Sequence, residues 1–203
     1  MANSNSNSNS TSKCHIYQQD ELFEVKNLLT ETECQKMTAR FQNQNQNQKD
    51  NPITLDNPAL AKHLFSNLQS YLPKQIESFV LDSICPQIRF YHYESDTEHI
   101  ADYRMGNSQL KSFYSVIIYL NSFDFKGGET GFYLKQQQLE TVIIKPTVGN
   151  AVICNQDILH WSVPIIEGEK LILRADVLYR TNNGDMEVNM EGDEWQQTPI
   201  NFI

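Results

Sequence analysis

Three residues in the middle and second half of the chain have the composition of a non-haem iron site. His99 and Asp102 form an H-x-x-D pair, and His160 lies 58 residues further on. Two imidazoles and one carboxylate on adjacent corners of an octahedron hold iron(II) in a facial triad. Residues three apart on a regular strand point to opposite faces, so a bulge or turn would have to re-aim one of the pair. A site built from His99, Asp102 and His160 therefore requires irregular backbone.

Two cations and a tyrosine are further candidates, each with a simpler alternative. Lys170 and Arg174 are four residues apart in the run KLILRADVLYR and would face the same side of a strand. On sequence alone, most such strand cations are merely solvated, and Tyr91 in QIRFYHY has core packing as its alternative role. A lone histidine such as His160 is likewise more often a structural or surface residue.

Two helices are predicted ahead of the strand-rich region. Thr30 and Glu33 have the spacing of a capping box before a helix that carries Cys34, Met37 and Phe41. Leucines repeat every four residues in the second helix, which Pro73 is expected to end. Its His63 is expected at the surface. Between the two helices, QNQNQNQKDN at residues 42–51 is a polar tract that predicts a loop.

From residue 86 onward the sequence changes to short runs rich in Val, Ile, Tyr and Phe, separated by Gly, Pro, Asn or Asp. Helices followed by such strands predict an α+β domain with a sandwich or barrel core. We expect a disordered Asn/Ser-rich tail at residues 1–15, one domain at 16–180 with its β core at about 86–180, and an acidic C-terminal tail at 181–203.

The order of these strands resembles the prolyl-4-hydroxylase-like branch of the Fe(II)/2-oxoglutarate dioxygenases. The resemblance spans roughly residues 55–180 and rests on the ordered motifs RFYHY (89–93), YLN (119–121), GGETGF (127–132), PTVG (146–149) and His160 with Lys170 ten residues later. It implies a double-stranded β-helix of the jelly-roll or cupin kind, with the N-terminal helices packed on one sheet.

The resemblance also implies roles for the candidate residues. Lys170 stands at the family's position for the cation that binds 2-oxoglutarate, because a carboxylate buried in a barrel must be paired and hydrogen-bonded. Arg174 and Tyr91 are expected beside it, and His160 stands at the position of the distal iron-binding histidine. The implied cofactors are 2-oxoglutarate and Fe(II), with ascorbate needed only if iron is bound.

The chain departs from the family pattern at the first two iron ligands, because it contains no H-x-D. Aligning IADYRMGN with the family's F-x-x-H-R-D-G places Tyr103 at the histidine and Met105 at the aspartate. An ungapped count instead selects Asp102 and Arg104. We favour the first register, which preserves an apolar residue before the ligands and a glycine after them, and methionine is a poor ligand for iron(II). His92, in the strand before this motif, is expected to face outward.

Two functions follow from this departure. In the first, the chain is a divergent dioxygenase-family protein with an impaired or lost iron site and a retained dicarboxylate pocket. In the alternative, it is an active iron- and 2-oxoglutarate-dependent hydroxylase of a peptidyl or amino-acid substrate, using His99, Asp102 and His160. The expected partners are a small dicarboxylate and a peptide or protein substrate.

Composition limits the other classes of function. A net charge of −9 disfavours the basic surface of a nucleic-acid-binding protein. The four cysteines lie far apart without a zinc-ligand spacing, which predicts reduced thiols. No apolar stretch has the length of a membrane span or the form of a signal peptide, so we expect a cytosolic or nuclear protein.

Overall fold

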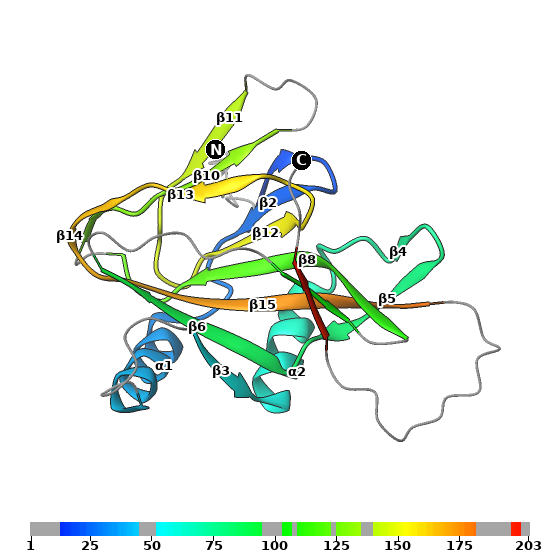
Figure 1. Ribbon diagram of the computed structural model, residues 1–203, viewed down its shortest axis with the longest axis horizontal. Helices are drawn as coiled ribbons and strands as arrows, with labels where there is room; N and C mark the ends of the chain where they lie inside the picture. Colours follow the sequence, from blue (N-terminus) through cyan, green and yellow to red (C-terminus); the bar gives the residue numbers. More distant parts are fainter. Residues whose placement is uncertain are drawn as a thin grey trace, which may run out of the picture.

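The structure is a computed structural model, shown in Figure 1. It describes residues 13–44, 52–94, 103–106, 109–122, 125–134, 140–181 and 196–199, with the backbone alone at 42–44, 103–105 and 196–199. His99 and Asp102 lie outside the described residues. So do most residues of the predicted N-terminal and C-terminal tails, whose disorder remains a prediction.

Both predicted helices are present, and each begins at a capped residue. Helix α1 (Glu31–Gln44) starts with the predicted capping box, in which Glu33 Oε2 accepts from Thr30 N at 2.8 Å and Thr30 Oγ1 accepts from Glu33 N at 3.2 Å. Helix α2 (Pro58–Leu68) begins with proline, and the Asn57 side chain accepts a hydrogen bond from Leu60 N at 3.1 Å. The second helix ends before the predicted limit at Pro73, because the chain turns after Leu68.

The main sheet is antiparallel and strongly curled (Figure 1). Its central order is β1 (Cys14–Gln18), β2 (Leu22–Val25), β12 (Ala151–Asn155), β8 (Leu110–Tyr119), β15 (Lys170–Thr181), β5 (Phe79–Ile84) and β4 (Gln75–Ile76). The remaining members are β3 (Ile53–Asp56), β6 (Gln87–Tyr93), β7 (Tyr103–Gly106) and β16 (Gln196–Pro199), with β6 joined to β15 and β7 to β8.

A second, smaller layer packs against the inner face of this sheet. It consists of β11 (Thr141–Ile144), β10 (Thr130–Tyr133) and β13 (His160–Ser162), accompanied by the pair β9 (Phe125–Gly127) and β14 (Ile165–Gly168). Phe132 and Ile144 from this layer share one buried cluster with Tyr119 and Ile172 of the main sheet. This mostly β architecture is the double-stranded β-helix, as the sequence predicted.

The long strand β15 shows how the main sheet separates its two faces. Leu171, Leu173 and Ala175 pack in the core under the helices, whereas Ile172 belongs to the inner cluster. Lys170 and Arg174 share the parity of Ile172, and both side chains are buried. The predicted common face for Lys170 and Arg174 is therefore confirmed, and it is the inner one.

The sheet contains more strands than the sequence pattern predicted. Five strands, β1 to β5, precede residue 86, and β2 pairs with β12 while β5 pairs with β15. The first of them begins at Cys14, within the predicted N-terminal tail. None of the four cysteines, all of which the structure describes, takes part in a disulfide, in agreement with the predicted reduced thiols. Among the described residues, no helix is both long enough and apolar enough to cross a membrane.

Candidate functional site

Lys170 is a buried cation at the start of β15, on the inner face of the main sheet. Its side chain is almost completely enclosed, with 2% of the residue exposed. Nζ donates a hydrogen bond to the carbonyl oxygen of Gly128 at 2.7 Å and lies 5.6 Å and 5.8 Å from the ring centroids of Tyr93 and Tyr119. Among the described residues, no carboxylate oxygen is within ion-pair distance of Nζ. A buried ammonium group with neutral partners can accept an anionic ligand.

Burial changes the acid strength of this group. Removal from water lowers the pKa of the Lys170 ammonium to about 8, and the charge of the nearby Glu129 opposes this shift. An incoming carboxylate would restore the charged form by pairing with it. The position therefore combines a destabilised cation with unused capacity to donate hydrogen bonds, since an ammonium has three N–H groups.

The backbone around Lys170 is fixed by two residues of the predicted motifs. Asn121, at the end of YLN, donates to the Glu169 carbonyl and accepts from Leu171 N, both at 2.8 Å, so it clamps the start of β15 to the end of β8. Gly128 has a φ of +72°, and a Cβ there would lie 3.0 Å from the Phe125 ring and 3.3 Å from Lys170 Cδ. The GGET motif thus brings a carbonyl close to the ammonium group.

Two further side chains place hydroxyl groups on the same inner face. The Tyr119 hydroxyl donates to Thr130 Oγ1 at 2.9 Å, and both residues are buried. Burial raises the pKa of the Tyr119 phenol, so it remains a neutral donor. The Thr130 hydroxyl hydrogen is thereby directed elsewhere, which makes it a candidate donor to a ligand. The sequence analysis treated Tyr119 as a buried strand residue and missed this contact.

The candidate Tyr91 lies on the same inner face of β6 as Tyr93, two residues away from it. It opposes Ile172 across the β6–β15 ladder and stacks on Tyr93, with ring centroids 5.8 Å apart and planes inclined by 4°. It is buried in the inner apolar cluster. Both proposed roles, packing and contact with a co-substrate, are compatible with this position.

Arg174 faces inward as predicted but reaches away from Lys170. Its Nη2 donates to Ser115 Oγ at 2.9 Å, and Ser115 pairs with Asp176 in the β8–β15 ladder. Asp176 in turn forms a buried ion pair with Arg89 and accepts from Gln156 Nε2 at 3.0 Å. Arg174 therefore belongs to a buried polar network at the other end of the inner face, which was not foreseen from the sequence.

His160 begins β13 and sits beside the inner cluster. Its ring stacks on that of Phe132, with centroids 5.5 Å apart, and Nδ1 is 3.1 Å from the Ile158 carbonyl oxygen. A carbonyl only accepts hydrogen bonds, so this contact requires the proton on Nδ1. Metal-binding histidines commonly have this arrangement, in which a carbonyl fixes the tautomer and orientation of the ring.

The partners that His160 would need for a metal site are not brought to it by the described part of the chain. Within that part, no three His, Cys, Asp or Glu side chains lie close enough together to hold a metal ion. Tyr103 and Met105 belong to β7, which pairs with β8 through Gly106 and Lys111. The choice between the two sequence registers remains a prediction.

The two remaining histidines of the helix and strand motifs behave as expected. His63 is exposed on α2, with Nε2 3.2 Å from Glu33 Oε1 of α1. His92 lies on the helix-covered face of β6, where its Nε2 is 2.6 Å from Glu169 Oε2 and its ring meets that of Phe41 edge-on. Neither points into the inner face.

The fold resembles those of solved prolyl hydroxylases and of HygX. A viral collagen prolyl hydroxylase from Paramecium bursaria Chlorella virus-1 matches with a TM-score of 0.56 at 14% identity, covering 79% of this chain and 91% of that one. A Pseudomonas putida prolyl-4-hydroxylase matches at 0.55 and 15%, covering 81% and 90%. HygX from Streptomyces hygroscopicus, with nickel and 2-oxoglutarate bound, matches at 0.51 and 10%, covering 88% and 92%.

No protein-family model matches the chain, and no curated protein matches it. At these identities the structural matches define the fold, which is that of the 2-oxoglutarate/Fe(II) dioxygenases. The viral enzyme has been solved in complex with 2-oxoglutarate, and HygX with both 2-oxoglutarate and a metal.

Proposed function

We propose that this chain binds 2-oxoglutarate or a similar small dicarboxylate on its inner face and has an impaired or lost iron site. The observation that carries the proposal is Lys170, a buried cation whose contacts among the described residues are a carbonyl and two aromatic rings. Keeping a lysine in such surroundings costs stability, so a ligand that pairs with it is a physical reason for its presence.

The residues around Lys170 fit one end of a dicarboxylate. The ammonium group would pair with a carboxylate, and the hydroxyl of Thr130 would donate to the same ligand from β10 in the smaller layer. The aromatic and aliphatic residues between Lys170 and Arg174, among them Tyr91 and Ile172, would cover its methylene carbons. When bound, 2-oxoglutarate would in addition supply two oxygen ligands for a metal.

The donor set for iron fits less well. The family's H-x-D is absent, and the favoured register places Tyr103 and Met105 at its positions. Imidazole and oxygen ligands suit iron(II), whereas a thioether does not. His160 alone provides one ligand. We therefore propose that the chain retains the dicarboxylate pocket but has lost the ordinary iron chemistry of the fold.

Thermal unfolding and calorimetry on metal-free protein test this proposal. Without a chelated metal, the affinity for 2-oxoglutarate should be near millimolar, about 4 kcal/mol of binding free energy. At a ligand concentration about ten times the Kd, the folded state gains roughly 1.4 kcal/mol. That gain should raise Tm by about 3–6 °C in a chain of this size.

Variants separate pocket binding from a general effect of the anion. Lys170→Ala should lose the shift, whereas Lys62→Ala, at an exposed position on α2, should keep it. Lys170→Ala combined with Arg174→Ala removes both inner-face cations and should also lose the shift. No shift in wild type at saturating ligand, or an equal shift in the double variant, would show that the pocket is lost as well.

The second candidate function is an active hydroxylase, and the orientation of the His160 ring favours it. The Ile158 carbonyl orients the ring through Nδ1, as carbonyls commonly do for metal-binding histidines. In that case His99 and Asp102 would complete the site. Iron analysis of anaerobically purified protein distinguishes the two functions, because His99→Ala or Asp102→Ala should abolish bound iron only if the rebuilt site exists.

A further inference from the structure

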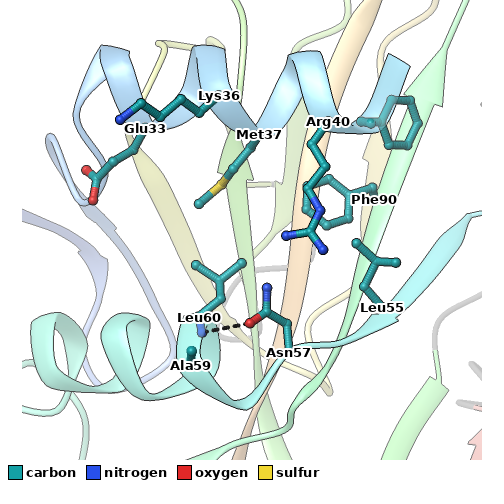
Figure 2. Close-up of a pocket in the computed structure, with 10 residues that line it drawn as sticks. Glu33, Lys36, Met37, Arg40, Leu55, Asn57, Ala59, Leu60 and Phe90 are labelled. Carbon is teal, nitrogen blue, oxygen red and sulfur yellow. Dashed lines mark hydrogen bonds between the residues drawn. The ribbon is translucent and has the colours of Figure 1, made fainter. Parts of the chain in front are cut away.

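A pocket lies on the opposite side of the main sheet from Lys170. It is enclosed by α1, by the first turn of α2 and by β3 and β6, and its volume is about 330 Å³ (Figure 2). Pockets that hold small molecules usually measure roughly 300–1,000 Å³. The inner-face site does not use this space, because Phe90, which lines it, alternates along β6 with the inward-facing Tyr91.

The interior of the pocket is apolar. Its lining includes Met37, Phe41, Leu55, Leu60 and Phe90. Figure 2 shows Met37 pointing from α1 toward α2, and Leu60 pointing back toward it. Phe41 and Phe90 are buried, with ring centroids 5.8 Å apart, whereas the other three are half-buried and face the open space. An apolar body could be covered here without rearranging the core.

The rim of the pocket carries two cations on adjacent turns of α1. Lys36 and Arg40 are four residues apart on the helix and both line the opening, and the Arg40 guanidinium extends toward Asn57 (Figure 2). Neither forms an ion pair with any residue that the structure describes. The acidic residue of the rim, Glu33, is already held by Thr30 and by His63. On a chain with a net charge of −9, this is a local excess of positive charge.

Helix α2 adds to the positive potential at the same place. The N-cap residue Asn57 and Ala59 of the first turn line the pocket, so the positive end of the helix dipole lies there. The Asn57 side chain already accepts from Leu60 N, so the helix end contributes a field rather than a vacant cap. The charges of the rim and the apolar interior together describe an amphipathic ligand.

We propose that this pocket binds a small amphipathic anion, an alkyl or aryl carboxylate, with its apolar body against Met37, Leu60 and Phe90 and its charge at Lys36 and Arg40. The site is separate from the dicarboxylate site and does not depend on the proposed function. The charge at the rim selects an anion over a neutral or cationic molecule of the same shape, and the apolar interior selects against small hydrophilic anions.

Octanoate is a suitable anionic probe, and octanol and octylammonium are its neutral and cationic counterparts with the same alkyl chain. Calorimetry on the full chain should show saturable binding of octanoate, at least about tenfold tighter than that of octylammonium. Lys36→Glu/Arg40→Glu should weaken octanoate binding by about tenfold or more and reduce its preference over octanol. Lys62→Glu, a single charge reversal at an exposed position on α2, should have little effect.

A variant that fills the pocket distinguishes loss of the binding site from misfolding of the chain. Ala59 is exposed at the pocket, so Ala59→Phe can fill it without disturbing the core, and it should abolish octanoate binding while leaving Tm unchanged. Octanoate binding that survives Ala59→Phe, or equal affinity for the three probes, would overturn the proposal. So would sedimentation showing self-association that Ala59→Phe removes, because the occupant would then be a second copy of the chain.

Discussion

Raising the pH from 7 to 9 should weaken the binding of 2-oxoglutarate to metal-free protein by about tenfold. Burial lowers the pKa of Lys170 to about 8, so roughly nine-tenths of the free protein carries the ammonium at pH 7 and one-tenth at pH 9. A carboxylate pairs only with the charged form. Affinity should therefore be nearly constant below pH 7 and should fall by about a factor of ten per pH unit once the pH exceeds the pKa.

Calorimetric titrations at several pH values, with chelator present, measure this profile directly. Lys170→Arg provides the control, because a guanidinium stays protonated throughout the range and should give a flat profile. The charged and titratable groups facing Lys170 are Glu129, Tyr93 and Tyr119, and burial raises the pKa of the Tyr119 phenol. A flat profile in wild type, or an equal decline in Lys170→Arg, would refute the assignment of the ligand to Lys170.

Three further predictions concern stability and the iron motif. Lys170→Met should raise the free energy of unfolding at pH 7 by up to about 3 kcal/mol in urea titrations, since lowering the pKa from 10.5 to about 8 measures the cost of the buried charge. The free energy of unfolding of wild type should rise by a similar amount between pH 8 and 10.5, where the folded protein loses the proton and the unfolded chain keeps it. An unchanged free energy of unfolding in Lys170→Met would contradict this prediction. Asp176→Ala should cost about 3–5 kcal/mol by leaving a buried arginine unpaired; a loss below 1 kcal/mol would show otherwise. Tyr103→His with Met105→Asp should gain bound iron, whereas Asp102→His with Arg104→Asp should not, because a one-residue slip reverses the strand faces.

The sequence predicted those parts of the fold whose signals are local. The capping box of Thr30 and Glu33 and the regular leucines of α2 each determine a helix from neighbouring residues. The apolar strands β8, β12 and β15 were likewise evident. Strands β1, β3 and β4 were missed because they are short and have mixed burial. Strands β2 and β5 were missed because their partners in the main sheet, β12 and β15, lie far away in the chain. Tertiary pairing decides such strands rather than local propensity.

The sequence predicted the cation of the candidate site but not the residues that surround it. The motif spacing selected Lys170, and the strand period correctly placed Arg174 on the same face. The contact between Tyr119 and Thr130 and the ion pair between Arg89 and Asp176 depend on how distant strands align. The ion pair joins residues 87 positions apart, a relation that a single sequence does not reveal.

The central claim, that a dioxygenase fold retains its dicarboxylate pocket without ordinary iron chemistry, is tested most directly by turnover of 2-oxoglutarate. Anaerobically purified protein is supplied with Fe(II), ascorbate, 2-oxoglutarate and then oxygen, and succinate is measured beside a His160→Ala variant. We predict that wild type forms no more succinate than this variant. Clear turnover by wild type that His160→Ala abolishes would contradict the account and would show that the chain is an enzyme with unusual iron ligands.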